Sequence, residues 1–72
     1  MKKNYGHIEF TKAEFGRWEV KDLMYNMVLG KCDDALFFPS KDDISFSIKD
    51  LKAICKFMKE MGSRDVNDNS NR

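Results

Sequence analysis

The chain has 72 residues, enough for one small domain, and its 13 basic and 12 acidic side chains give a formal net charge of +1. This balance argues against the dominant cationic surface with which proteins neutralise nucleic-acid phosphates. The two cysteines, Cys32 and Cys55, are far apart in a sequence without a secretory signal, so reduced thiols and a cytoplasmic location are expected.

The N-terminal half contains two apolar segments that predict strands near residues 5–10 and 15–20. In the second segment, "GRWEV", uncharged and charged side chains alternate, which is typical of a strand with one buried face. The stretch that follows is apolar and ends at Gly30. It is therefore expected to form a short helix over residues 21–29.

A second interpretation places one long helix in this region. Thr11 and Glu14 are spaced as a capping box, and a helix from there to Leu29 would change the element order to β-α-β-β-α. It would place Gly16 in the middle of the helix, at a cost of about 1 kcal/mol, and would leave Trp18 on the exposed face. The interpretation with two strands and a short helix is therefore favoured.

The C-terminal half predicts a hairpin followed by a helix. Strands are expected near residues 35–39 and 43–47, on either side of a polar turn. The helix is expected over residues 48–61, with Ser47 as the N-cap. Apolar residues at three- and four-residue spacing define its predicted buried stripe: Ile48, Leu51, Ile54, Cys55, Met58 and Met61. Phe57 lies outside this stripe, at its edge.

Two similar stretches, "WEVKDL" and "FSIKDL", predict that the chain repeats one strand–strand–helix unit. In each, an aspartate (Asp22 or Asp50) would occupy the first turn of a helix, where a carboxylate is stabilising. The predicted fold is therefore a ββαββα domain of the α+β class, with a four-stranded, mostly antiparallel sheet and both helices on one face. The domain would span residues 1–62 and end at the helix C-cap Gly62, and the polar segment 63–72 is expected to be a disordered tail.

No motif for catalysis, cofactor binding or metal binding is evident in the sequence. His7 is the sole histidine, and no nucleophile or partner carboxylate stands out near it. Two separated cysteines and one histidine fall short of the four ligands that a structural zinc ion takes. We therefore expect a protein that is not an enzyme and that holds no metal or cofactor.

Aromatic and basic side chains outside the expected core predict a protein-binding surface. If Leu36 and Phe38 face the core, Phe37 must point to the other face of the sheet, where Tyr5 and Arg17 are expected. Exposed aromatic residues beside an arginine are typical of binding hot spots. Tyr25 and Phe57 are the comparable positions on the two expected helices, at or outside their apolar stripes. The predicted site therefore comprises Tyr5, Arg17, Tyr25, Phe37 and Phe57.

The predicted function is that of a small, non-enzymatic protein-binding module. Its size and its Lys-, Asn- and Ile-rich composition are typical of phage and mobile-element proteins. The expected partner is therefore a larger bacterial protein, such as a host enzyme or defence component that the module inhibits. A homodimer through the open sheet face or an edge strand is a second expectation for so small a domain.

The alternative function is binding of a small ligand or of single-stranded nucleic acid. Trp18, Tyr25 and Phe37 could stack on a base, with Arg17 and lysines on the phosphates. The near-zero net charge disfavours this alternative. No apolar run is long enough to predict a membrane span.

Overall fold

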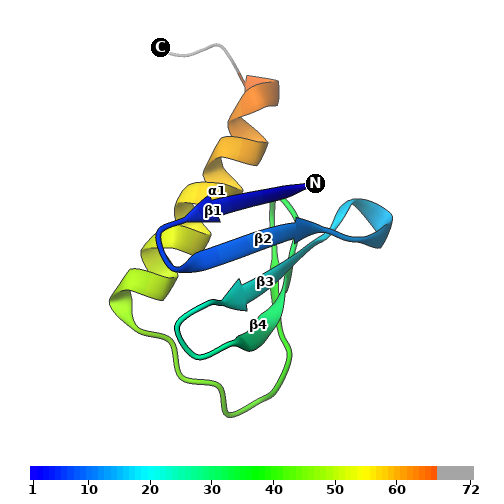
Figure 1. Cartoon of the computed structure of the whole chain (residues 1–72). Coiled ribbons are helices and arrows are strands. Elements are labelled where there is room, and N and C mark those ends of the chain that lie inside the picture. The colour runs from blue at the N-terminus through cyan, green and yellow to red at the C-terminus, as the bar shows by residue number, and fades with distance from the viewer. Residues whose placement is uncertain (67–72) are drawn as a thin grey trace.

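The computed structural model describes the backbone of residues 1–66 and the side chains of residues 1–62, which form a five-stranded antiparallel sheet with one helix packed on one face (Figure 1). The strands follow chain order across the sheet, each paired with the next. The elements are β1 (Lys2–Tyr5), β2 (Ile8–Lys12), the 3₁₀ turn η1 (Glu14–Gly16), β3 (Trp18–Asp22), β4 (Met27–Cys32), β5 (Phe37–Pro39) and α1 (Ile48–Val66). The predicted α+β class is confirmed, but the predicted four strands and two helices are not what the chain forms.

The largest correction concerns residues 21–29, which form a turn and a strand and not the expected helix. The carboxylate of Asp22 accepts hydrogen bonds from the backbone N–H groups of Met24 and Tyr25, at 2.8 and 3.3 Å. Asn26 has a φ of 52°, a left-handed conformation that asparagine tolerates well. The chain therefore reverses after β3, and β4 pairs back against it with Met27 opposite Asp22.

Two of the predicted strands, over residues 5–10 and 43–47, also differ from the structure. Residues 5–10, expected as one strand, contain the turn between β1 and β2, in which Gly6 has a φ of 64° that glycine adopts without steric cost. Residues 43–47, expected as a strand, are part of the irregular connection from β5 to α1. The repeated strand–strand–helix unit is therefore wrong, because "WEVKDL" leads into a turn and only "FSIKDL" leads into a helix.

The C-terminal helix is confirmed, and its start follows the predicted capping. Ser47 Oγ accepts a hydrogen bond from the Asp50 N–H at 3.1 Å, and the Ser47 N–H donates to Asp50 Oδ2 at 3.0 Å. This reciprocal pair is a capping box that satisfies two backbone donors at the helix start. The helix continues to Val66, past the predicted C-cap Gly62, and residues 67–72 of the predicted tail lie outside the described residues.

The core lies between α1 and the face of the sheet that α1 covers. It consists of Ile8, Phe10, Trp18, Val20, Leu29, Cys32, Ile54 and Phe57. At its centre the ring of Phe57 stacks on Phe10 with centroids 3.9 Å apart, and the edge of Trp18 meets it at 5.1 Å. Phe57 is only 1% exposed, so the expectation that it lies off the buried stripe of the helix is wrong.

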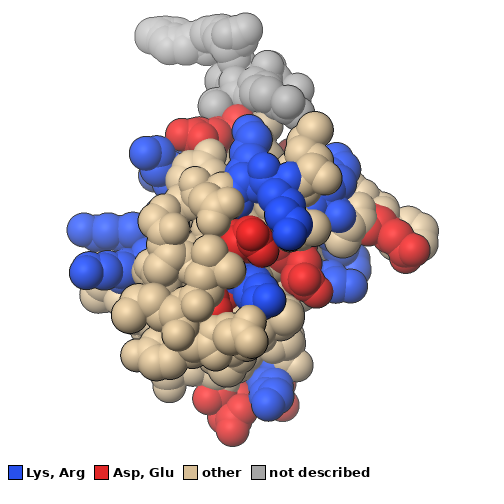
Figure 2. All heavy atoms as spheres, viewed as in Figure 1, with Lys and Arg blue, Asp and Glu red and all other residues tan. Residues whose placement is uncertain are grey.

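The opposite face of the sheet carries charged side chains, with the exposed apolar residues Val28 and Phe38 among them. Glu9 lies opposite Lys21 and Glu19 lies opposite Lys31, so unlike charges face each other across neighbouring strands. In Figure 2, where the strands lie in front of the helix, acidic and basic side chains lie together in a central band, beside a broad area of uncharged residues. In the described part of the chain, no helix has both the length and the apolar character needed to cross a lipid bilayer.

Strand β5 crosses β4 very closely at Gly30. A Cβ atom at this position would lie 2.2 Å from the carbonyl oxygen of Phe38 and 2.9 Å from Cα of Pro39. Both neighbours are backbone atoms, which cannot rotate away as a side chain can. A glycine at position 30 is therefore required for β5 to pair with β4.

Candidate protein-binding site

Helix α1 carries two apolar stripes, and the sheet covers one of them. Ile54 and Phe57 are buried against the strands, together with the half-buried Met61. The neighbouring stripe consists of Ile48, Leu51, Cys55 and Met58, at the three- and four-residue spacing of one helix face. Ile48, Leu51 and Cys55 are exposed, Leu51 by 48%. In the part of the chain that the structure describes, α1 is the one α-helix, so no second helix covers this stripe.

The exposed stripe forms one wall of an apolar groove, here called the α1 groove. The opposite wall comes from β5 and the connection that follows it, where the rings of Phe37 and Phe46 meet edge to face at 5.5 Å. The groove has a volume of about 850 Å³, and nearly all of its exposed lining is apolar. Its lining residues are Asp34, Phe37, Phe46, Leu51, Ile54, Cys55, Met58, Lys59 and Gly62.

A row of lysines runs along α1 beside the groove. Lys49, Lys52, Lys56 and Lys59 recur at the same three- and four-residue spacing as the apolar stripe, and all four are exposed. Lys59 lines the groove itself, and Lys52 and Lys56 line a smaller hollow with Cys55 and Glu60. The long side of the groove formed by α1 is therefore basic, although the chain as a whole is nearly neutral.

Two of the predicted binding residues are packed inside the domain. Tyr5 lies on the face of the sheet that α1 covers, with its ring edge-on to Phe10 and Phe57 at 5.5 and 5.7 Å. Its hydroxyl donates a hydrogen bond to Glu60, which raises the pKa of Tyr5 together with partial burial and the charge of the carboxylate. Phe57 is the centre of the core.

The other three predicted residues lie on different parts of the surface. Phe37 points toward the helix side and lines the α1 groove, the reverse of the predicted direction, because β5 pairs Cys32 with Phe37 on the core-facing side. Phe38 takes the outward position, where the guanidinium of Arg17 lies 4.6 Å from its ring centroid. Tyr25 is 74% exposed in the β3–β4 turn. The five residues therefore do not form one patch, and only Phe37 belongs to the groove.

The sequence assigned the groove residues Leu51, Cys55 and Met58 to the core. The signal that could have separated them from the core was Phe57, an apolar residue outside the predicted stripe. Apolar residues on more than one stripe indicate a helix with two contact faces. Phe46 was predicted as part of a core strand and had no signal of its own, because its direction depends on the irregular connection before α1.

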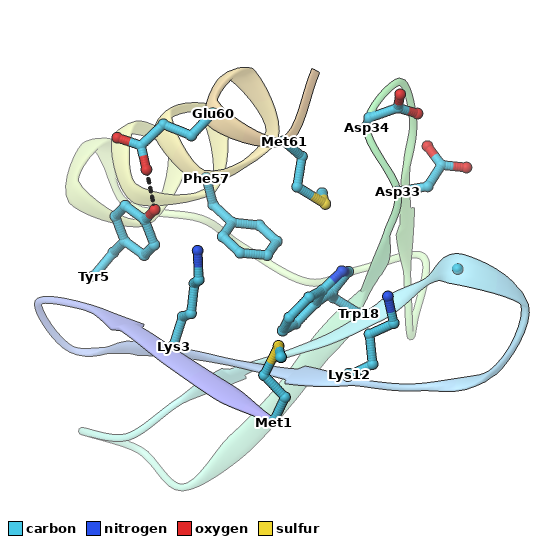
Figure 3. Close-up of a pocket in the computed structure, with 11 residues that line it drawn as sticks. Met1, Lys3, Tyr5, Lys12, Trp18, Asp33, Asp34, Phe57, Glu60 and Met61 are labelled. Carbon is cyan, nitrogen blue, oxygen red and sulfur yellow. Dashed lines mark hydrogen bonds between the residues drawn. The ribbon is translucent and has the colours of Figure 1, made fainter. Parts of the chain in front are cut away.

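A second, smaller pocket lies between β1, β3 and α1 and is shown in Figure 3. Its volume is about 340 Å³, and its floor is formed by the rings of Trp18 and Phe57. Lys3 enters it from β1 and faces Glu60 across the opening, and Asp33 and Asp34 lie on the loop after β4. Because basic and acidic side chains oppose each other around its rim, this pocket has no preference for one sign of ligand charge.

A third feature is a cluster of titratable side chains from three separate elements. His7 from the β1–β2 turn, Asp22 from the end of β3 and Asp50 from the first turn of α1 each place a ligand-type atom within 4.8 Å of the other two. The Nε2 atom of His7 lies 2.5 Å from Oδ1 of Asp50. Burial by itself would raise the pKa of Asp50, but the hydrogen bonds from the Ser47 backbone and from His7 outweigh it and lower the pKa.

The two cysteines differ in access. Cys55 is exposed and lines the α1 groove, whereas Cys32 is buried in the core at the end of β4. Burial and the neighbouring charge of Asp33 raise the pKa of Cys32 to about 11. Cys55 is therefore a natural chemical reporter of the groove, and Cys32 stays in its unreactive thiol form.

Comparisons of the chain with protein-family models, with curated proteins and with solved structures gave no significant match.

Proposed function

We propose that this protein is a small, non-enzymatic protein-binding module whose α1 groove receives an acidic, amphipathic segment of a partner protein. The observation that supports this most strongly is the second apolar stripe of α1, with Leu51 48% exposed above a groove of about 850 Å³. Apolar residues that the fold leaves in contact with water at regular helical spacing are typical of a surface that another chain covers.

The chemistry of the groove specifies the kind of segment that fits it. Its walls offer aromatic and thioether side chains, which accommodate bulky apolar anchors such as leucine or phenylalanine. Burying one such anchor contributes about 1.5–3 kcal/mol, so two or three anchors supply much of the roughly 8 kcal/mol that micromolar binding requires. The binding mode is that of a helix laid in a groove, with anchors at spacing i, i+3 or i+4, and i+7.

The lysine row specifies the charge of the segment. Lys52, Lys56 and Lys59 lie beside the apolar stripe, so acidic residues flanking the anchors would meet them at the rim of the interface. Rim charges of this kind raise the association rate and select the partner more than they add affinity. A partner segment with basic flanks would be disfavoured.

A larger bacterial protein remains the proposed partner, and inhibition of a host enzyme or defence system is the form of this function suggested by size and composition. The alternative of base stacking on single-stranded nucleic acid has less support. Of the three aromatic residues considered for it, Trp18 is in the core and Phe37 packs against Phe46, which leaves Tyr25.

The proposal can be tested by selecting helical peptides from a displayed library on the full chain. The expected result is enrichment of peptides with apolar anchors and acidic flanks, whose affinity falls at least about tenfold in Leu51→Asp. Phe15→Asp is the matched control, because Phe15 is 90% exposed on the η1 turn, outside the groove, and has a φ of 61° that aspartate tolerates. Selected peptides should also protect Cys55 from alkylation.

Three results would contradict the proposal. The first is that the selected peptides bind Leu51→Asp as tightly as the unchanged chain. The second is enrichment of peptides with basic flanks. The third is that no selected peptide protects Cys55 from alkylation. A doubled mass in light scattering that Leu51→Asp restores to 8.4 kDa would instead identify a second copy of the chain as the occupant. Strong binding of single-stranded nucleic acid that falls steeply with salt would favour the alternative function.

A further inference from the structure

We propose that His7, Asp22 and Asp50 form a binding site for a divalent transition-metal cation, with Zn²⁺ as the best-fitting ion. The three residues supply one imidazole nitrogen and two carboxylate oxygens whose positions all lie within 4.8 Å of one another. They come from the β1–β2 turn, the end of β3 and the first turn of α1. A bound ion would therefore join the helix to two neighbouring hairpins.

The cluster buries two carboxylates that have no lysine or arginine partner in the described part of the chain. Asp22 is 3% exposed and Asp50 is 6% exposed. Asp50 pairs with His7, and among the described residues neither Asp22 nor Asp50 has an ion pair with a lysine or arginine. Buried carboxylates that lie close together need a compensating positive charge, and a cation between them supplies it.

One of the two carboxylate oxygens of Asp22 has no hydrogen-bond donor among the described residues. Its Oδ1 atom accepts the two hydrogen bonds that shape the β3–β4 turn. Its Oδ2 atom accepts no hydrogen bond from any described residue, although the residue is almost fully buried. A buried carboxylate with an oxygen that accepts no hydrogen bond, and with a ligand atom within 4.8 Å of an imidazole nitrogen, is chemically suited to bind a metal ion.

The distances require only small movements. Around a tetrahedral ion with bonds of about 2.0–2.2 Å, ligand atoms lie about 3.4 Å apart. Nε2 of His7 and Oδ1 of Asp50, now 2.5 Å apart, would separate by less than about 1 Å, and the widest pair in the cluster would close by about 1.4 Å. The three protein ligands leave the fourth position to water, which can enter beside the partly exposed His7.

The donor set selects the class of ion. Imidazole with carboxylate suits Zn²⁺ and its first-row neighbours, whereas Mg²⁺ and Ca²⁺ favour oxygen ligands alone. In the sequence these ligands are far apart, and the two aspartates looked like equivalent helix-start residues. The folded chain brings them together because the two hairpin turns adjoin, with the Leu23 N–H donating to the His7 carbonyl at 2.8 Å.

His7 makes the test direct, because it is the chain's sole histidine and its imidazole NMR signals can be followed without ambiguity. The full chain with Cys55→Ser, which removes the exposed thiol as a competing ligand, is titrated with ZnCl₂. The expected result is a saturable shift of the His7 signals at one equivalent of Zn²⁺, no shift with Mg²⁺, and a rise in Tm of at least about 5 °C.

The ligand assignment is tested by substitutions that preserve the turns. Asp22→Asn and Asp50→Asn retain an oxygen that can accept the existing backbone hydrogen bonds, and each should weaken Zn²⁺ binding at least about tenfold. Asp43→Asn removes an exposed carboxylate outside the cluster and should change nothing. Absence of a saturable His7 shift in the parent chain, or Zn²⁺ affinity in both asparagine variants equal to that of the parent chain, would overturn the proposal.

Discussion

Truncation of Phe57 is the sharpest test of how α1 is oriented on the sheet. Phe57 is 1% exposed, stacks on Phe10 at 3.9 Å and receives the edges of Trp18 and Tyr5. Phe→Ala changes in such cores cost about 3–5 kcal/mol, and the loss of aromatic pairing places Phe57→Ala at the upper end of that range. A chain of this size has a total stability of about 4–11 kcal/mol, so the variant should lose a large fraction of it.

Leu51→Ala is the matched control on the same helix. The sequence pattern places Leu51 in the core and Phe57 outside it, whereas the folded chain has the reverse arrangement. Because Leu51 is 48% exposed, its truncation should cost less than about 1 kcal/mol. The two substitutions therefore separate the two orientations of the helix by several kcal/mol.

The assay is urea unfolding followed by circular dichroism, with Tm from a thermal scan as a second readout. Phe57→Ala should lower Tm by about 15 °C or more, and Leu51→Ala by only a few degrees. The reasoning would be refuted if Leu51→Ala cost more than Phe57→Ala. A cost below about 1 kcal/mol for both would show that α1 does not pack on the sheet as described.

Three further predictions follow from single features of the fold. Gly30→Ala should lower the free energy of unfolding in urea by about 2–3 kcal/mol. Gly62→Ala should be neutral or stabilising, because a Cβ atom at this position on α1 would make only an ordinary contact at 3.9 Å. Equal effects of the two substitutions would contradict the close crossing of β5. The pKa of Asp50 is lower in the folded than in the unfolded state, so the contribution of Asp50 to stability is complete above about pH 4 and is lost as the pH falls further. Asp50→Asn should therefore flatten this part of the stability–pH curve. An unchanged slope in the variant would count against the lowered pKa. Iodoacetamide at pH 8 should label Cys55 in the folded chain and Cys32 only after unfolding, and mass spectrometry that finds both labelled at similar rates would refute the burial of Cys32.

Much of the C-terminal half could be predicted from the sequence because its signals are local. Ser47 and Asp50 are spaced for a capping box, and apolar residues follow at helical intervals for several turns. Both signals depend on hydrogen bonds within a few residues, so the folded chain retains them. The alternation in "GRWEV" likewise predicted β3, although its limits differ by a few residues.

The candidate site could be predicted less well, because its residues depend on which face of an element meets the rest of the molecule. Phe37 and Phe38 are adjacent aromatic residues, and either could face the core until the pairing of β5 with β4 decides between them. The same holds for the two apolar stripes of α1. Periodicity showed that the helix is amphipathic, but only contact with the sheet selected Phe57 and left Leu51 in the groove.

By itself, the sequence determined a single small α+β chain with a capped C-terminal helix, an alternating strand after Gly16 and no recognisable catalytic motif. The tertiary structure decided that residues 21–29 become a turn and a strand, because β3 and β5 complete the hydrogen bonds of β4 from both sides and Asp22 holds the turn. It also decided that Asp22 and Asp50 meet at His7, since only the packing of α1 on the hairpin ends brings these distant residues within 4.8 Å. Local sequence patterns reflect contacts between residues that are close together in the chain. Strand pairing and helix packing join residues that are far apart in sequence, and no local pattern predicts these contacts.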